Sequence, residues 1–248
     1  MSPESVRVLG VRVDRVTTEQ ALHMMERFIA ERRPHQVVTL NPEFVIKAQH
    51  NAEFRVTLEE ADLALPDGAG LLWAARLLGR PLLERVTGSD IVPLIAEMSA
   101  RQGYRLYLLG AAPGVAEKAA ETLKRNYPGL QIVGAYAGSP DPAEEDGIIA
   151  RIVAASPAFL FVAYGAPRQD LWIHRNLRRL GVPVCMGIGG TLDFIAGVAV
   201  RAPRWMRKVG LEWLHRLLRQ PWRWRRMLAL PQFTYLVMRQ ALFGVGRE

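Results

Sequence analysis

Strand-like apolar runs alternate with helix-length segments along most of this chain, and this alternation limits the possible folds more than any other feature. The strand-like runs stand at residues 36–40, 61–65, 105–109, 131–136, 159–164 and 182–188. Helices are expected from residue 42 onward and over residues 71–78, 88–101, 114–126, 142–154 and 168–179. Such an alternation produces a mostly parallel sheet with helices on both faces. We therefore predict a Rossmann-like α/β fold.

Charge divides the chain near residue 200. Residues 1–200 carry 21 basic and 22 acidic side chains, whereas residues 201–248 carry 11 basic side chains and two Glu. With 248 residues, of which 50% are hydrophobic, the chain is long enough to bury a substantial core. We predict an α/β catalytic domain over residues 1–200, with sub-blocks at about 1–103 and 104–200, followed by a basic helical appendage over residues 201–248.

The basic segment has the pattern of a helix that lies on a surface. When residues 203–220 are placed on one helix, apolar side chains fall on one face and most Arg and Lys on the other. Residues 222–226 then interleave tryptophan with arginine, as residues at a membrane interface do. We predict binding to an anionic membrane surface. The alternative is a terminal helix that packs on its own core or on a partner subunit.

Two further patterns bear on partners and location. Nucleic acid is the other common partner of basic, aromatic segments, but the near-neutral body and the leucine-rich tail favour lipid, so we expect no nucleic acid. Residues 1–7 lack the apolar run of a signal peptide. The longest uncharged stretch of the tail, residues 227–238, is 12 residues long, and a spanning helix needs about 20. We expect a cytoplasmic protein attached peripherally to the membrane.

Metal and disulfide chemistry have little support in the sequence. The one cysteine, Cys185, lies in an apolar run and is expected to be a small buried hydrophobe. The histidines show no paired spacing of the kind that binds zinc, and no D-x-D triplet occurs. We therefore expect no required metal and no cofactor.

Glycine-rich turns follow several of the predicted strands. The turn Gly110-Ala111-Ala112-Pro113-Gly114 leads from a strand into a helix, where backbone N–H groups can approach a phosphate. It matches neither the dinucleotide nor the P-loop motif, so an ordinary turn is the alternative. Ligands of parallel sheets bind at the carboxyl ends of the strands. We predict nucleotide contacts from Gly110, Ala111, Pro113, Gly114, Tyr136, Gly165, Gly189, Gly190 and Asp193.

Polar side chains also gather at the predicted strand ends. Thr39 and Asn41 follow one strand, Asp67 another, and Gln169 with Asp170 a third. Each residue has an ordinary alternative, because Thr39 suits a strand, Asn41 a helix cap, Asp67 an Asp-Gly turn and Gln169 a first helical turn. Their convergence on one edge of the sheet instead favours a site that binds a sugar and removes a proton from its acceptor.

One basic residue outside the tail is a candidate ligand for phosphate. Arg85 has the guanidinium geometry that holds a phosphate with two hydrogen bonds. The alternative is a surface ion pair.

Taken together and in order, these segments resemble the WecG/TagA/CpsF family of bacterial glycosyltransferases. The resemblance begins at residues 9–14 and continues through residues 39–43, 61–70, 84–90, 108–114, 164–170 and 187–194 into residues 202–203. So many segments in one order are more specific than any single turn.

The resemblance implies an inverting, membrane-associated enzyme that needs no metal. Such enzymes move a sugar from a UDP donor to an undecaprenyl-diphosphate-linked sugar during assembly of teichoic acid or other surface polysaccharides. For this chain we expect N-acetylmannosamine as the sugar and N-acetylglucosamine on the acceptor. The resemblance further implies that self-association is possible.

The resemblance also assigns roles to particular residues. It implies Asp67 as the general base, a substrate pocket that includes Thr39, Asn41, Arg85 and Gln169, and tail arginines that reach the diphosphate. The tail arginines that match best are Arg216, Arg223 and Arg226. An NAD-linked or other nucleotide-dependent enzyme, or a non-catalytic membrane-binding module, remains the alternative.

Overall fold

A six-stranded parallel sheet forms the centre of the protein. The computed structural model describes residues 3–244. The strand order is β4-β3-β8-β7-β5-β6, and every neighbouring pair is parallel. The strands are β3 (His35–Leu40), β4 (Leu63–Pro66), β5 (Arg105–Gly110), β6 (Gln131–Tyr136), β7 (Phe159–Ala163) and β8 (Val184–Gly187). The predicted α/β fold is confirmed.

The last strand, β8, joins the two sub-blocks expected from the sequence. Val184 of β8 is in register with His35 of β3 on one side and with Phe159 of β7 on the other. One continuous sheet therefore carries strands from residues 1–103 and from residues 104–200.

Two layers of helices cover the sheet, because successive strand residues point to opposite faces. Val37 and Leu63 belong to one core cluster and their neighbours Val38 and Ala64 to another. The first face carries α1 (Thr18–Glu31), α5 (Gly88–Gln102), α6 (Val115–Asn126) and α9 (Thr191–Ile195). The second carries α2 (Pro42–His50), α3 (Ala52–Glu60), α7 (Pro142–Ala155) and α8 (Arg168–Leu180).

Several elements were not expected from the sequence. The strands β1 (Ser5–Val8) and β2 (Val11–Asp14) form an antiparallel hairpin, with positive φ angles at Leu9 and Gly10 of the turn. The helices α1 and α3 were also missed. A capping box between Thr17 and Gln20 begins α1. Asn51 separates α2 from α3 and caps the latter, with Oδ1 accepting from the backbone N–H of Phe54.

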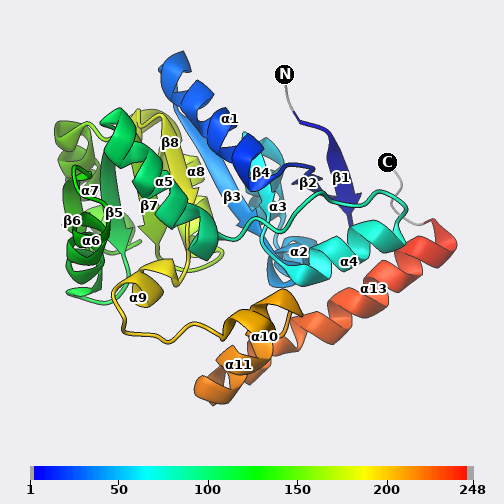
Figure 1. Ribbon diagram of the computed structural model, residues 1–248. Helices are drawn as coiled ribbons and strands as arrows, with labels where there is room; N and C mark the ends of the chain where they lie inside the picture. The colour runs from blue at the N-terminus through cyan, green and yellow to red at the C-terminus, as the bar shows by residue number, and fades with distance from the viewer. Residues whose placement is uncertain (1–2, 245–248) are drawn as a thin grey trace.

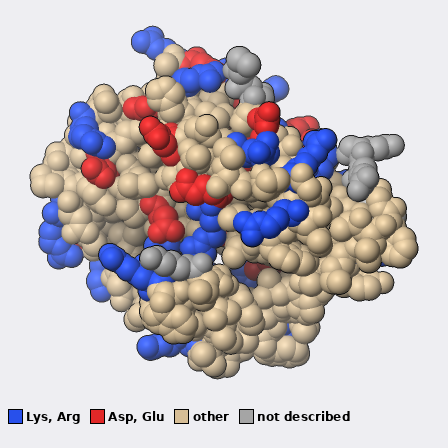
Figure 2. Space-filling view, turned by 45° about the vertical axis from the view of Figure 1, so that its right-hand side comes forward, with Lys and Arg blue, Asp and Glu red and all other residues tan. Residues whose placement is uncertain are grey.

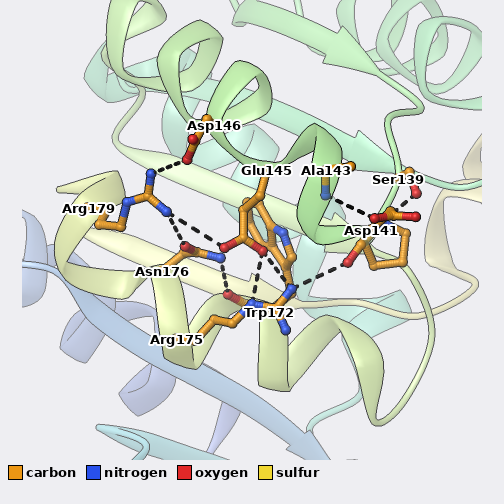
Figure 3. A network of polar contacts seen from close by, with 10 residues as sticks. Ser139, Asp141, Ala143, Glu145, Asp146, Trp172, Arg175, Asn176 and Arg179 are labelled. Carbon is orange, nitrogen blue, oxygen red and sulfur yellow. Dashed lines mark hydrogen bonds and ion pairs between the residues drawn. The ribbon is translucent and has the colours of Figure 1, made fainter.

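A network of ion pairs fastens α7 to α8 (Figure 3). Glu145 of α7 accepts from Nε and Nη2 of Arg175 at 2.9 and 2.6 Å. Arg179 lies 3.7 Å from Glu145 and 2.5 Å from Asp146, and it also donates to Asn176. Glu145 and Asn176 are buried, and the network joins the two helices to each other, so its role is structural.

The tail is a chain of short helices and one long helix. Its elements are α10 (Arg204–Lys208), α11 (Glu212–Arg219), a 3-10 turn (Pro221–Arg223), α12 (Trp224–Met227) and α13 (Ala229–Phe243). The single helix expected over residues 203–220 is wrong. Gly210 breaks it with φ of +78°, and a side chain there would meet Cβ of Ala69 at 2.8 Å. Ala69 begins α4 (Ala69–Leu77), so the break lets the tail approach the body closely.

The long tail helix α13 packs on the body instead of projecting from it. Figure 1 shows α13 running beneath α2 and α4, below the sheet. Phe233 and Val237 are buried in the core cluster of α2 and α3, and Gln240 Oε1 accepts from the N–H of Leu9 in the hairpin turn. For α13, the alternative interpretation, a terminal helix that packs on the protein's own core, is confirmed. In the described part of the chain, none of the helices has the length and apolar character required to span a bilayer.

Candidate active site

Ten of the predicted site residues line one cavity of ≈ 520 Å³ at the carboxyl ends of β3, β4, β7 and β8. Tail helices cover the cavity from the other side, through Glu212, Trp213 and Arg216 of α11 and through Leu230 and Thr234 of α13. The predicted residues that line it are Thr39, Asn41, Asp67, Arg85, Gly165, Gln169, Gly189, Gly190, Arg216 and Arg226. The volume is in the range of small-molecule sites.

The end of β3 supplies two polar residues to the cavity wall. Thr39 is buried, and its hydroxyl donates to the carbonyl of Gly187 in β8 at 3.2 Å. Asn41 begins α2, and its Oδ1 accepts from the N–H of Phe44 at 3.2 Å. The capping alternative for Asn41 is therefore correct, and the same residue also lines the cavity. The cap places the positive end of the helix dipole beside the site.

Asp67 follows β4 and lies at the edge of the cavity. Its own N–H donates to the carbonyl of Leu40 at 2.7 Å, and its carboxylate accepts from the N–H of Gly88 at 3.3 Å. Burial, with a smaller contribution from Glu212, raises the pKa of Asp67 to about 7, although Gly88, Arg85 and Arg216 act in the opposite direction. A carboxylate with a pKa near neutrality suits proton removal.

The Arg85 side chain is held by a carboxylate from the tail. Its Nη1 lies 3.9 Å from Oε2 of Glu212, and the two side chains are 20% and 28% exposed. Glu212 Oε1 lies 3.7 Å from Nε of Arg201, which also pairs with Asp90 at 2.8 Å. The ion pair anticipated as the alternative for Arg85 is present, but it lies in the cavity wall.

Arg216 enters the cavity from α11. Its guanidinium stacks 4.9 Å above the ring of Phe194 in α9. Burial lowers the pKa of Arg216. Among residues 3–244, no carboxylate forms an ion pair with it, so its donors are available to an anionic ligand.

Arg226 and Glu43 connect the tail to α2. Nε and Nη2 of Arg226 donate to the two oxygens of Glu43, both at 2.8 Å, and Lys47 lies 2.8 Å from the same carboxylate. Burial alone would raise the pKa of Glu43, but hydrogen bonds from Arg226 and Lys47 outweigh it and hold that pKa below its usual value. Two of the donors of Arg226 are therefore already bonded to Glu43 of α2 before any ligand binds.

Gln169 ties together two of the glycine turns. It is 1% exposed, and its Oε1 accepts from the N–H groups of Gly165 and Gly189 at 3.1 and 3.0 Å. The next residue, Asp170, is fully buried, and burial raises its pKa to about 7. Its carboxylate lies against Gly187 and does not line the cavity. A raised pKa thus does not by itself identify the base, and position in the cavity favours Asp67.

Five of the predicted nucleotide contacts lie away from the cavity lining: Gly110, Ala111, Pro113, Gly114 and Tyr136. The turn after β5 has a positive φ at three of these positions, and a side chain at Gly110 would meet the backbone of Ala163 at 2.8 Å. The Tyr136 ring is covered by Arg151 at 4.9 Å. The assignment of these residues to a nucleotide stays a prediction.

A further predicted residue, Asp193, stands at the margin of the site. A side chain at Gly190 would lie 3.3 Å from Oδ2 of Asp193 and 3.0 Å from Nη2 of Arg216, which places Asp193 beside the cavity although it does not line it. The backbone of Arg223 belongs to the 3-10 turn, and its side chain lies outside the described part of the structure.

The cavity also contains residues that the sequence did not indicate. Glu43, Glu212, Trp213 and Phe194 all line it. One signal was present for Glu212, because it is the single acidic residue among residues 201–244. The part of the chain that the structure describes holds no group of three or more His, Cys, Asp or Glu side chains arranged for a metal ion. Independence from a metal stays a prediction.

Comparison with known proteins identifies relatives that match nearly the whole chain. The model of the glycosyl transferase WecG/TagA/CpsF family matches residues 6–246. A protein of Bacillus spizizenii is 33% identical over 92% of this chain and 88% of its own length, and is named N-acetylglucosaminyldiphosphoundecaprenol N-acetyl-beta-D-mannosaminyltransferase. Proteins of the same name from Bacillus subtilis and Staphylococcus aureus are each 30% identical, over 88% and 94% of this chain and over 84% and 91% of their own lengths.

Proposed function

This chain belongs to the WecG/TagA/CpsF family of glycosyltransferases, and we propose that it transfers N-acetylmannosamine from a UDP donor to N-acetylglucosaminyl-diphosphoundecaprenol. The sugar and the acceptor are those in the names of its relatives. Membership of a glycosyltransferase family sets aside the NAD-linked and non-catalytic interpretations of the sequence.

One observation supports the proposed chemistry above the others. A carboxylate with a pKa of about 7 shares a cavity with guanidinium groups of the tail. Glycosyl transfer needs both, because the acceptor hydroxyl must lose a proton while the departing diphosphate gains negative charge. The sheet supplies the first group and the tail supplies the second.

In the proposed mechanism the acceptor hydroxyl attacks the anomeric carbon of the donor from the face opposite UDP. Asp67 takes the hydroxyl proton as the new C–O bond forms, and the bond from the anomeric carbon to the UDP oxygen breaks with inversion. The electron pair of that bond leaves with UDP. Arg85 and Arg216, which line the cavity, stabilise the departing diphosphate, and we propose that no resident metal ion is needed.

We further propose that the tail holds the enzyme on the membrane surface that carries the acceptor. Trp205, Leu218 and Trp222 are 62%, 70% and 72% exposed. Figure 2 shows that the lower part of this face is largely free of charged side chains, and Figure 1 places α10–α13 at that height. Aromatic and leucine side chains enter the interface, and the tail arginines favour anionic headgroups.

The deciding experiment offers a panel of UDP-sugars to the full-length enzyme with a short-chain diphosphate-linked N-acetylglucosamine acceptor. We expect transfer from UDP-N-acetylmannosamine, in the presence of EDTA as well as without it. Transfer of a different sugar, with none of N-acetylmannosamine, would overturn the donor assignment. Loss of activity in EDTA, with recovery on addition of a divalent cation, would overturn metal independence.

Membrane attachment is tested separately with a double variant, Leu218→Ala with Trp222→Ala. We expect it to sediment less with anionic liposomes than the wild type while still turning over the short-chain acceptor. The matched control is Val56→Ala, because Val56 is 49% exposed on α3, away from the tail. Equal sedimentation of all three proteins would exclude the tail as the membrane contact.

A further inference from the structure

Glu212 has a position that the proposed mechanism does not use. It is the first residue of α11, it lines the cavity, and it is the single acidic residue among residues 201–244. An acid in a segment otherwise rich in arginine, next to a site that receives a diphosphate, opposes the charge of the substrate. The position of Glu212 in the cavity therefore needs a specific explanation.

Glu212 contacts two arginines from different parts of the chain. Its Oε2 lies 3.9 Å from Arg85, which precedes α5, and its Oε1 lies 3.7 Å from Arg201, which precedes α10. Both distances are longer than a hydrogen bond. Within residues 3–244, Nε and Nη2 of Arg201 are buried and form no hydrogen bond. Glu212 therefore orients the two guanidinium groups without saturating their donors.

We propose that Glu212 is a positioning residue: supported by Arg201, it holds Arg85 ready for the diphosphate of the substrate and places the tail against Asp67. The inference rests on the proposed function; Arg85 lines the cavity, whereas Arg201 does not line it and contacts Glu212. Phosphate oxygens at about 2.8 Å make stronger bonds to a guanidinium than a carboxylate at the distances observed here. The substrate then gains Arg85 while Glu212 keeps it in place.

A second consequence concerns the charge that surrounds Asp67. The charged groups that face Glu212 are Arg85, Arg201, Arg216 on its own helix, and Asp67 after β4; Asp90 of α5 lies behind Arg201. The carboxylate of Glu212 raises the pKa of Asp67, a contribution second to that of burial among those that raise it. Removal of this negative charge lowers that pKa, so Asp67 stays ionised to a lower pH.

The test compares Glu212→Gln with the wild type at pH 6 and pH 8. We expect kcat/KM at pH 8 to fall about tenfold, from lost orientation of the arginines. The ratio of kcat/KM at pH 6 to that at pH 8 should rise about threefold. Glu212→Asp should keep the wild-type ratio. The matched control is Glu97→Gln, which breaks an exposed pair with Arg101 at 3.6 Å on α5 and should change neither quantity.

A merely structural contact would lower thermal stability without moving this ratio, and an unchanged ratio in Glu212→Gln would overturn the proposal. Failure of the proposed function is recognised separately, by wild-type protein that transfers no sugar. In that case the titration of Asp67 is followed without activity, as the difference in Tm between wild type and Asp67→Asn across pH. The same Tm difference, measured between proteins that both carry Glu212→Gln, should change at a lower pH. If the curves of Tm difference against pH coincided with and without Glu212→Gln, the proposal would again be overturned.

Discussion

Two charge clusters of this protein use the same residue types in opposite ways. In the α7–α8 network, Glu145 meets Arg175 at 2.6 Å and a second arginine at 3.7 Å. In the cavity, Asp67 accepts a backbone N–H at 3.3 Å and, within residues 3–244, forms no ion pair. Arg216 likewise lies over an aromatic ring, away from any carboxylate that the structure places in ion-pair range. In the first cluster the charged side chains pair with one another, whereas in the second some hydrogen-bond donors and acceptors remain for a substrate.

The largest effect should come from Asp67, the proposed base. Asp67→Asn keeps the shape of the side chain but cannot take the proton, so we expect transfer to fall about 10²- to 10⁴-fold while UDP still binds. Single-turnover assays and isothermal titration with UDP measure the two properties. Near-wild-type transfer by this variant would remove Asp67 from the mechanism and would weaken the contrast between the clusters.

Arg216→Ala should have the next largest effect. Loss of charge-assisted hydrogen bonds to the diphosphate should lower kcat/KM about 10- to 100-fold. The control is Arg219→Ala, one turn further along α11, where the side chain is exposed. Equal losses in the two variants would show that the tail acts through its overall charge and not through a placed guanidinium.

Below about pH 7, kcat/KM of the wild type should change about tenfold for each pH unit. Because burial raises the pKa of Asp67 to about 7, the carboxylate is protonated and inactive as a base below that pH. We expect log kcat/KM to fall with a slope of one below about pH 7 and to level off above it. If kcat/KM fell only near pH 4, Asp67 would be solvated like an ordinary carboxylate, or another group would be the base.

Arg175→Ala tests the other cluster and should leave the chemistry intact. Its removal leaves Glu145 with the more distant Arg179, so we expect Tm to fall by a few degrees. Activity per folded molecule should change less than twofold, because the network lies on α7 and α8 and contributes nothing to the cavity lining. A large loss of kcat with an unchanged Tm would reverse the roles given to the two clusters.

The smallest effect is a gain in stability when the base is removed. The folded protein keeps the Asp67 proton up to about pH 7, whereas the unfolded chain releases it near pH 4, so the cost of ionisation accumulates between these values and is complete above pH 7. Asp67→Asn should therefore raise Tm at pH 8 by a few degrees and by less at pH 5. A lower Tm for the variant at pH 8 would argue against a raised pKa.

The sequence predicted the sheet and most of the cavity because both depend on local pattern. Parallel strands end on the same edge, so polar residues that follow separate strands, such as Thr39, Asp67 and Gln169, meet there whatever the exact strand order. Asn41 shows the limit of choosing between alternatives, since it caps a helix and also lines the cavity.

What the sequence did not predict depends on contacts between distant segments. The break in the tail at Gly210 follows from its approach to Ala69, and helical periodicity carries no information on that approach. The pairing of Glu212 with Arg85, and of Arg226 with Glu43, likewise requires that the tail be docked. The hairpin β1–β2 was missed because its short strands are recognisable only by their pairing.

The helices that cover the cavity, α11 and α13, follow all the strands in the sequence, and this has a consequence for biosynthesis. During translation, the strands that position Asp67 leave the ribosome well before α11 and α13 do. Before these helices form, a nascent chain therefore carries Asp67, the proposed base, without Arg216 and Arg226 opposite. The cavity is complete only when α11 and α13 have docked, and the hydrogen bond between Gln240 and Leu9 then joins segments that are 231 residues apart in the sequence.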